Sequence, residues 1–224
     1  MTRGLFVTGT DTGVGKTWVS AGLMAALQGQ SLRMLGMKPV AAGCAPTADG
    51  LRNEDALLLQ RQGSHPVDYA VINPYAFAPP VAPHIAAEMA GTRIDLAVIE
   101  RHYRSLAAQA DAVVVEGAGG WLVPLNERET MAGLAARLEL EVVLVVGLRL
   151  GCINHALLTA EAIRRRGCRL TGWIANTLDL HMSKLPQNVL TIQQRIDAPL
   201  LGLIPYMDTL SVDAVAAQLT LNTG

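Results

Sequence analysis

The residue types best suited to chemistry in this chain gather in a glycine-containing run near its start, GTDTGVGKT at residues 9–17. Glycines let successive backbone N–H groups turn inward, and a helix that begins directly after them adds the positive end of its dipole, so the run predicts a phosphate-binding loop. In such a loop the Lys16 ammonium reaches the outer phosphates of a nucleotide, and the Thr17 hydroxyl ligates Mg²⁺. The strict spacing would place the first glycine where the chain has Thr10. A tight strand-to-helix turn with a surface lysine is the alternative interpretation.

Two acidic residues and a second lysine follow at the ends of expected elements. Glu116 ends the apolar run DAVVVE and precedes the glycine-rich residues 117–120. A carboxylate at the carboxyl end of a buried strand beside a phosphate loop is placed to hold Mg²⁺, whereas the alternative is a helix-capping or solvated glutamate. Lys38 closes another strand and would lie near the outermost phosphate, although alone it equally suits an ordinary surface lysine. Asp55 starts a helix, where it either ligates the metal or simply favours the helix N-terminus.

Apolar runs that suit buried strands alternate with helical patterns along most of the chain. Their nearly continuous valine, leucine and isoleucine content is typical of strands covered on both faces. The expected strands are 5–8, 33–40, 111–116, 141–146, 170–175 and 200–204. The expected helices are 16–28, 95–110, 130–138, 154–166 and 184–196. This alternation implies right-handed crossovers, so we expect an α/β fold with a doubly wound, mostly parallel sheet of the phosphate-loop NTPase type.

We expect residues 1–224 to form a single phosphate-loop α/β domain, because the length suits one compact unit and the composition does not change along the chain. The one irregular stretch is NPYAFAPPVAPH at residues 73–84, whose four prolines exclude a helix or a central strand. We interpret it as an ordered loop that crosses an edge or the mouth of the sheet. A linker between two domains is the alternative.

The composition excludes several classes of protein. Hydrophobic residues make up 50% and charged residues 17% of the chain, which excludes disorder as the main state. The net charge of −1 leaves no basic surface for nucleic acid. No apolar run reaches the ~18–20 residues that a membrane span needs, and the opening apolar stretch is too short for a signal peptide. The three cysteines show no ligand-like spacing, so we expect reduced thiols in a cytoplasmic protein.

Taken together, these motifs resemble the dethiobiotin synthetase family over nearly the whole chain. The matching segments, in order, are GTDTGVGKT, MKPVAAG, LRNEDALLLQ, NPYAFAPPVAPH, VVVEGAGGWLVPL, LVVGLRLGCINHALLT, GWIANT and GLIPY. The resemblance implies an ATP-dependent ring closure that converts 7,8-diaminopelargonate, CO₂ (or bicarbonate) and ATP into dethiobiotin, ADP and phosphate. One amine captures CO₂ as a carbamate, the γ-phosphate activates the carbamate as a mixed anhydride, and the second amine closes the ureido ring.

The resemblance also implies roles for individual residues. Lys38, Lys16 and Thr12 would be catalytic, with the two lysines on carbamate and phosphate oxygens and Thr12 on the carbamate. Mg²⁺ would be held by Thr17, Asp55 and Glu116. The implied nucleotide-binding residues are Gly13, Val14, Gly15, Lys16, Thr17, Trp18, Asp55, Glu116, Gly117, Ala118, Gly119, Asn176, Thr177, Pro205, Tyr206 and Met207. Within this set Asn176 would read the adenine edge, and the last four would shape the base pocket.

The implied substrate-binding residues are Thr12, Lys38, Ala42, Gly151, Cys152 and Asn154. The family is a homodimer, and the segment around the last three would hold the substrate carboxylate from the partner subunit. Three features depart from the family pattern. Ala42 stands where the family has a serine, Gly13 replaces a commonly acidic residue, and residues 178–190 show little likeness.

Two other functions share this type of nucleotide fold. An ATP-dependent amide-forming enzyme of the cobyrinate amidation kind carries a glutaminase portion with a nucleophilic cysteine, for which 224 residues leave no length. A nucleotide-switched positioning ATPase carries a second lysine early in the phosphate loop, where this chain has Asp11. Turnover that requires both diamine and bicarbonate distinguishes the synthetase from these two alternatives.

Overall fold

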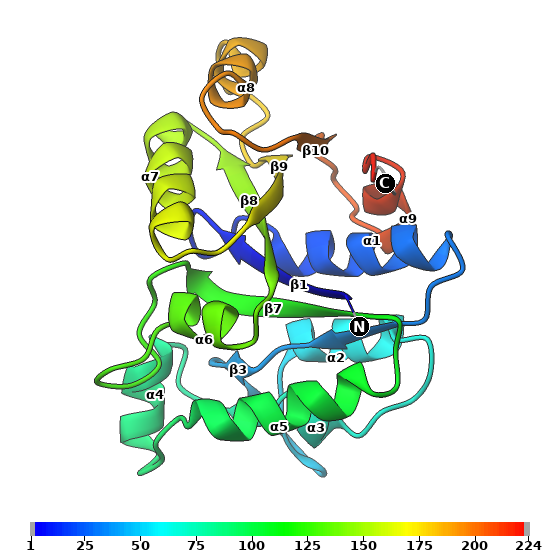
Figure 1. The fold of residues 1–224 in the computed structure, drawn as a ribbon, viewed down its shortest axis with the longest axis vertical. Helices are drawn as coiled ribbons and strands as arrows, with labels where there is room; N and C mark the ends of the chain where they lie inside the picture. Colours follow the sequence, from blue (N-terminus) through cyan, green and yellow to red (C-terminus); the bar gives the residue numbers. More distant parts are fainter. Residues whose placement is uncertain (1–2, 222–224) are drawn as a thin grey trace.

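A parallel six-stranded sheet forms the centre of the molecule in the computed structural model, which describes residues 3–221 (Figure 1). Its strands lie in the order β10-β9-β8-β1-β7-β2, and every neighbouring pair is parallel. The strands are β1 (Arg3–Gly9), β2 (Met34–Met37), β7 (Ala112–Gly120), β8 (Glu141–Leu148), β9 (Leu170–Thr177) and β10 (Leu200–Ile204). The order places β1 between β7 and β8, so the chain turns from one half of the sheet to the other beside β1, as in doubly wound folds.

Helices cover both faces of this sheet, which explains the unbroken apolar character of its strands. One face packs against α1 (Lys16–Gln28), α2 (Glu54–Gln62) and α9 (Val212–Ala216). The other face packs against α4 (Pro83–Met89), α5 (Leu96–Ala107), α6 (Met131–Arg137), α7 (Cys152–Arg165) and α8 (Leu185–Gln193). Along β1, Leu5 and Val7 face the first layer and Phe6 faces the second, as the two-residue period of a strand requires. The expected doubly wound α/β fold is therefore confirmed.

The expected strand 33–40 is wrong in its second half. The strand β2 ends at Met37, and a separate strand β3 (Val40–Ala41) pairs with β6 (Tyr75–Ala76) in a second parallel sheet. Pro39 lies between them and has no N–H to donate to a ladder, so the chain leaves the central sheet at this point. Lys38 N instead donates to the carbonyl of Ile72 at 2.9 Å.

The expected loop at residues 73–84 is wrong at both of its ends. Its first part supplies β6, whose flanking N–H groups on Tyr75 and Phe77 donate to Pro39 and Ala41. Its last part begins α4 with Pro83, a position where the missing N–H costs no helical hydrogen bond. The prolines therefore exclude the central sheet, as expected, but permit a short edge pair and a helix start.

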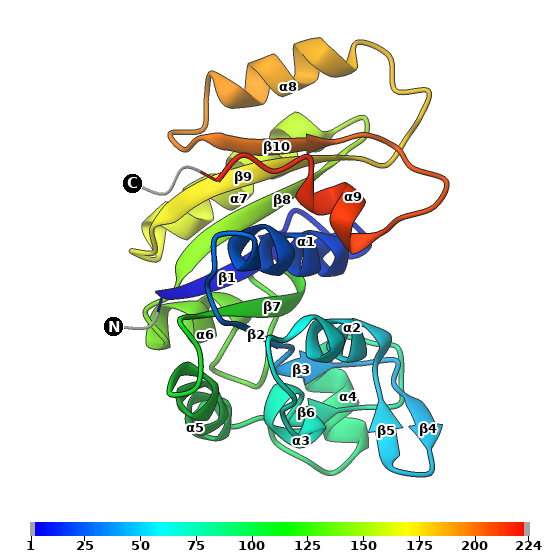
Figure 2. The same ribbon diagram turned by 90° about the vertical axis from the view of Figure 1, so that its right-hand side faces the viewer.

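Several short elements lie together at one end of the molecule (Figure 2). They are the antiparallel hairpin of β4 (Ala45–Thr47) and β5 (Gly50–Arg52), the pair β3–β6, and the helices α2, α3 (Tyr69–Ile72) and α4. The hairpin and α3 carry no sequence pattern that we recognised. Among residues 3–221, none of the helices combines the length and the apolar character needed to traverse a bilayer.

A glycine in β2 allows the helix α2 to lie close to the sheet. A Cβ atom on Gly36 would lie 2.8 Å from Leu59 Cβ of α2 and 3.1 Å from Met24 Sδ of α1. Both distances are shorter than normal carbon contacts, so the glycine sets the separation between β2 and the two helices. Because α2 begins at Glu54, this packing also sets where Asp55 lies.

We expect Gly36→Ala to destabilise the protein by about 1–3 kcal/mol, because the added methyl group must push α2 outward. The matched control is Gly29→Ala at the end of α1, where φ is −59° and the nearest atom to an added Cβ lies 3.3 Å away. Urea unfolding of both variants measures the difference. Equal changes in the free energy of unfolding would contradict this account of the close packing.

Candidate active site

The glycine-containing run forms a loop between the end of β1 and the start of α1. Gly13 and Gly15 have φ angles of 73° and 89°, in the left-handed region where glycine is favoured. Gly15 is the residue that caps α1, and no side chain accepts from the first N–H groups of the helix. These groups therefore remain available to an anion at the positive end of the helix dipole. The strand–loop–helix context expected for a phosphate-binding loop is present.

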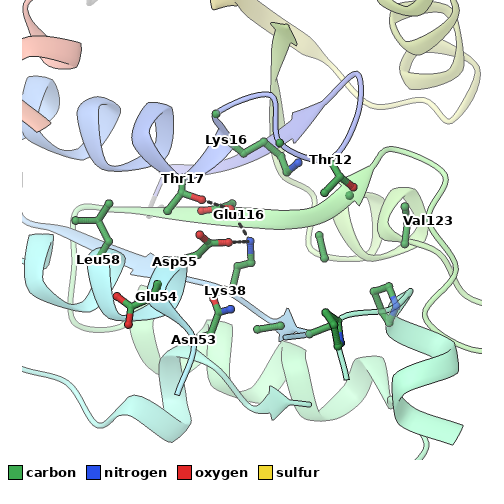
Figure 3. Close-up of a pocket in the computed structure, with 18 of the residues that line it drawn as sticks. Thr12, Lys16, Thr17, Lys38, Asn53, Glu54, Asp55, Leu58, Glu116 and Val123 are labelled. Atoms are coloured by element: carbon green, nitrogen blue, oxygen red, sulfur yellow. Dashed lines mark hydrogen bonds and ion pairs between the residues drawn. The ribbon is translucent and has the colours of Figure 1, made fainter. Parts of the chain in front are cut away.

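A second lysine and two carboxylates meet beside this loop (Figure 3). Lys38 Nζ lies 2.5 Å from Glu116 Oε1 and 2.9 Å from Asp55 Oδ2. Thr17 Oγ1 donates to the same Glu116 oxygen at 3.0 Å. The side chains of Lys38 and Glu116 are 6% and 1% exposed, whereas that of Asp55 is 40% exposed. Residues far apart in the sequence thus form one polar cluster, largely shielded from water.

The members of the cluster come from different elements. The expectation that Glu116 ends its strand is wrong, because β7 continues past it to Gly120 through the glycine-rich residues. Met37 of β2 pairs with Val115 of β7, so the residues that follow, Lys38 and Glu116, arrive side by side. Asp55 lies in the first turn of α2, which the side chain of Asn53 caps by accepting from the N–H of Ala56. From the sequence alone, Asp55 could either ligate a metal or only stabilise the start of a helix. In the structure it lies in the first turn of α2 and also pairs with Lys38.

Burial and charge shift the pKa values of these groups. Burial alone would lower the pKa of Lys38, but the charges of Glu116 and Asp55 outweigh it and raise that pKa above its ordinary value. Burial raises the pKa of the Glu116 carboxyl, and the Lys38 ammonium opposes part of the rise. Burial, together with the nearby Lys38 charge, lowers the pKa of Lys16 to about 8. The site therefore holds positive charge at some electrostatic cost, which an anionic ligand would relieve.

A cavity of about 840 Å³ opens over the phosphate loop and the polar cluster. Twelve of the expected site residues line it, namely Thr12, Gly13, Gly15, Lys16, Thr17, Trp18, Lys38, Ala42, Asp55, Glu116, Ala118 and Gly119. Other lining residues were not expected from the sequence, among them Leu58, Arg61, Val123 and the segment 80–83. The only signal for that segment was its place in a proline-rich run, which suggested the mouth of the sheet.

Other expected nucleotide-binding residues lie beside the cavity without lining it. Val14 is buried under the loop, and its carbonyl accepts from Asn176 Nδ2 at 2.9 Å. Asn176 also lies close to Gly15, since a Cβ atom added to Gly15 would be only 2.3 Å from Asn176 Nδ2. Gly117 lies between two lining residues and offers its carbonyl to Lys38 Nζ at 3.5 Å. Thr177 ends β9, and Pro205, Tyr206 and Met207 follow β10, on the same edge of the sheet.

The segment around Gly151 lies apart from the cavity. Gly151 has a φ of 93° and caps α7, and Cys152 is buried in the apolar layer beneath it. Asn154 lies in the first turn of α7. Leu150, directly before this segment, is 96% exposed.

The parallel sheet, the phosphate loop and the lysine and carboxylates beside that loop define a phosphate-loop NTPase. Residues 3–214 match the AAA domain family. The fold is similar to the septum site-determining protein MinD from Pyrococcus horikoshii, with a TM-score of 0.59, 18% identity, and coverage of 98% of this chain and 87% of that chain. It is also similar to a ParA family ATPase from Chlorobium tepidum, with a TM-score of 0.58, 13% identity, and coverage of 98% and 91%. At these identities the likeness shows the fold alone.

Sequence relatives identify the family. The chain is 53% identical to the ATP-dependent dethiobiotin synthetase BioD of Cellvibrio japonicus, over 98% of this chain and 96% of the relative. It is 52% identical to the protein of the same name from Pseudomonas aeruginosa, over 96% of this chain and 95% of the relative. The chain belongs to the ATP-dependent dethiobiotin synthetase family, and the expected family is confirmed.

We expect Lys38→Met to destabilise the protein by about 3–5 kcal/mol near pH 8, because it leaves the Glu116 carboxylate buried without its partner. The double variant Lys38→Met, Glu116→Gln should recover most of this loss, since neither charge remains. A raised pKa means that the folded state favours the protonated carboxyl, so the Lys38→Met penalty should shrink as the pH falls towards 5 and grow as it rises.

Urea unfolding between pH 5 and pH 8, without divalent cations, measures these changes. The control is Arg93→Met, because Arg93 pairs with Glu127 at 3.3 Å and both side chains are more than half exposed. That exposed pair should contribute less than about 1 kcal/mol. The explanation by an unpaired Glu116 charge would be contradicted if the loss of unfolding free energy in Lys38→Met did not depend on pH. It would also be contradicted if the double variant lost as much.

Proposed function

We propose that the cavity over the phosphate loop is where this enzyme makes dethiobiotin from 7,8-diaminopelargonate, CO₂ and ATP, with residues 1–224 acting as one domain. The observation that carries the proposal is the convergence of Lys16, Lys38 and two carboxylates on one cavity of about 840 Å³. That volume lies within the range of small-molecule sites. Both the nucleotide and the diamine must reach the same few atoms, and one shared cavity meets that requirement.

The central physical problem of the reaction is that its two reacting partners are both anions. A carbamate oxygen must approach the γ-phosphate of ATP, and their like charges repel. Lys16, from the phosphate loop, and Lys38, from the end of β2, project into the cavity from different elements (Figure 3). Fixed positive groups at the place where negative charge gathers lower the barrier, because they need no reorganisation during the reaction. Thr12, exposed at the rim of the loop, is placed to donate its hydroxyl to the carbamate.

The oxygen ligands of the cluster suit Mg²⁺. Glu116 Oε2 is buried and has no hydrogen-bond partner, so one carboxylate oxygen is free to accept a cation. Thr17, Asp55 and Glu116 offer hard oxygen ligands from three elements, and phosphate oxygens and water would complete the shell. Among the described residues, no group of three or more His, Cys, Asp or Glu side chains could hold a metal. Bound Mg²⁺ would neutralise part of the triphosphate charge.

We further propose that the adenine base lies beyond the loop, where Asn176, Thr177 and residues 205–207 end or follow β9 and β10. What supports this is that ligands of doubly wound sheets collect outside the carboxyl ends of the strands. The Asn176 amide donates one N–H to the carbonyl of Val14, and its second N–H and its oxygen would read the base. Tyr206 is 46% exposed, which leaves its ring free to cover a base.

We also propose a homodimer in which Gly151, Cys152 and Asn154 of one copy hold the substrate carboxylate in the cavity of the other. The support is that these residues lie outside the cavity of their own copy, and that Leu150 beside them is 96% exposed. Ala42 lines the cavity, so the methyl group that replaces the family's serine faces the proposed diamine site. One absent neutral hydrogen bond costs about 0.5–1.5 kcal/mol, which affects affinity more than the type of reaction.

The decisive experiment measures ADP release with and without 7,8-diaminopelargonate and bicarbonate. We expect turnover only when both small molecules are present, and dethiobiotin equal in amount to the ADP released. ATP hydrolysis that ignores the diamine would instead support a nucleotide-switched ATPase and defeat the proposal.

The two lysines should differ in what they affect. We expect Lys16→Ala to abolish productive ATP binding, because its ammonium lies in the phosphate loop. Lys38→Ala should leave nucleotide bound and lower kcat by a factor of about a hundred or more, because the charge lost is the one nearest the reacting groups. Calorimetric titration with ATP, beside steady-state kinetics, separates binding from chemistry. Near-normal turnover in Lys38→Ala would refute its catalytic role.

A further inference from the structure

An ion pair outside the cavity joins the phosphate loop to the neighbouring strand. Arg149, directly after β8, donates from its guanidinium to Asp11 Oδ2 in the loop. Both side chains are 47% exposed, and neither residue lines the cavity. An effect of this pair on a ligand in the cavity would therefore pass through the loop residues that do line it.

Asp11 connects this ion pair to two of the loop residues that line the cavity. Its Oδ1 atom accepts from the backbone N–H of Thr12 at 2.7 Å. Its backbone carbonyl accepts from Lys16 Nζ at 3.0 Å. One residue thus contacts Arg149 on the outside of the loop and both Thr12 and Lys16 on the inside.

The charge of Asp11 also matters to any anion in the loop. The N–H of Thr12 is the first cause that lowers the pKa of the Asp11 carboxyl, and Arg149 lowers it further, so Asp11 carries a negative charge at neutral pH. His155 of α7 contributes a smaller lowering of the same pKa. Without Arg149, the Asp11 carboxylate would repel a triphosphate bound in the same loop. Salt screens charges that close together only in part.

We propose that Arg149 is a positioning residue for the ATP site. It neutralises Asp11 and, through Asp11, holds the loop in the shape that presents Thr12 and Lys16 to the phosphates. This inference rests on the proposed function of the cavity. An exposed ion pair adds little to stability, so its contribution should be seen in ATP binding rather than in folding.

The test compares Arg149→Ala, Arg149→Lys, Asp11→Asn and the double variant Arg149→Ala, Asp11→Asn. We expect Arg149→Ala to raise KM for ATP, and the Kd of a non-hydrolysable ATP analogue, about tenfold, while kcat stays within about threefold. Arg149→Lys keeps the charge and should remain close to wild type. The double variant should recover most of the lost affinity, because the asparagine side chain has no charge to neutralise and still accepts from Thr12.

Arg33→Ala is the matched control, because Arg33 forms an ion pair of similar exposure with Asp111 at the opposite ends of the strands. It should leave the Kd unchanged. The proposal is overturned if Arg149→Ala binds the analogue like wild type, or if Arg33→Ala weakens binding equally. It is also overturned if the double variant stays as weak as Arg149→Ala, since Arg149 would then contact the phosphates itself. Analogue binding needs no turnover, so these outcomes are independent of whether wild-type ADP release requires the diamine.

Discussion

The buried ion pair between Lys38 and Glu116 is the interaction on which the rest of the site depends. Neither charge tolerates its low-dielectric surroundings without the other, so β2, which Lys38 follows, and β7, which contains Glu116, must lie side by side. Thr17 joins the pair through the same Glu116 oxygen and so ties the start of α1 to β7. Asp55 completes the cluster from α2. The start of α1, the start of α2 and the ends of the cavity that carry Lys38 and Glu116 are therefore one hydrogen-bonded unit.

This hydrogen-bonded unit lies at the carboxyl edge of the sheet, and apolar layers pack on both faces of the sheet beside it. Val7, Val14 and Val145 belong to the layer packed against α1, and Val115 and Val146 belong to the opposite layer. Close packing of both layers leaves the loop and the strand ends little freedom to separate. Such rigid support is what an electrostatically preorganised site requires, because misplaced charges lose most of their effect on a transition state.

The sequence predicted the central sheet well, because strands buried on both faces carry a composition that few other elements share. It also predicted that the phosphate loop, Lys38 and Glu116 would lie at the carboxyl edge of the sheet, where the structure brings them together around one cavity. Their mutual contacts depend on the strand order, which no local pattern encodes. The end of β2 before Pro39, the β4–β5 hairpin and the position of residues 80–83 at the cavity could not be predicted. They involve short segments whose pairing depends on tertiary contacts. Arg149 lies within one of the family-like segments, but its contact with Asp11 could not be predicted, because the two residues are 138 positions apart and only the fold brings them together.

The cavity takes its two walls from parts of the chain that fold as separate sheets. The phosphate side belongs to the central sheet, whereas Ala41, Ala42 and the segment 80–83 belong to or adjoin the β3–β6 pair. Pro39 interrupts the backbone ladder between these sheets, so a change in the outer wall need not be transmitted to the phosphate loop. If the proposed function is correct, substitutions at residues 80–83, in enzyme engineering or in evolution, would change the size and shape of the cavity while leaving the phosphate loop, Lys38 and Glu116 in place.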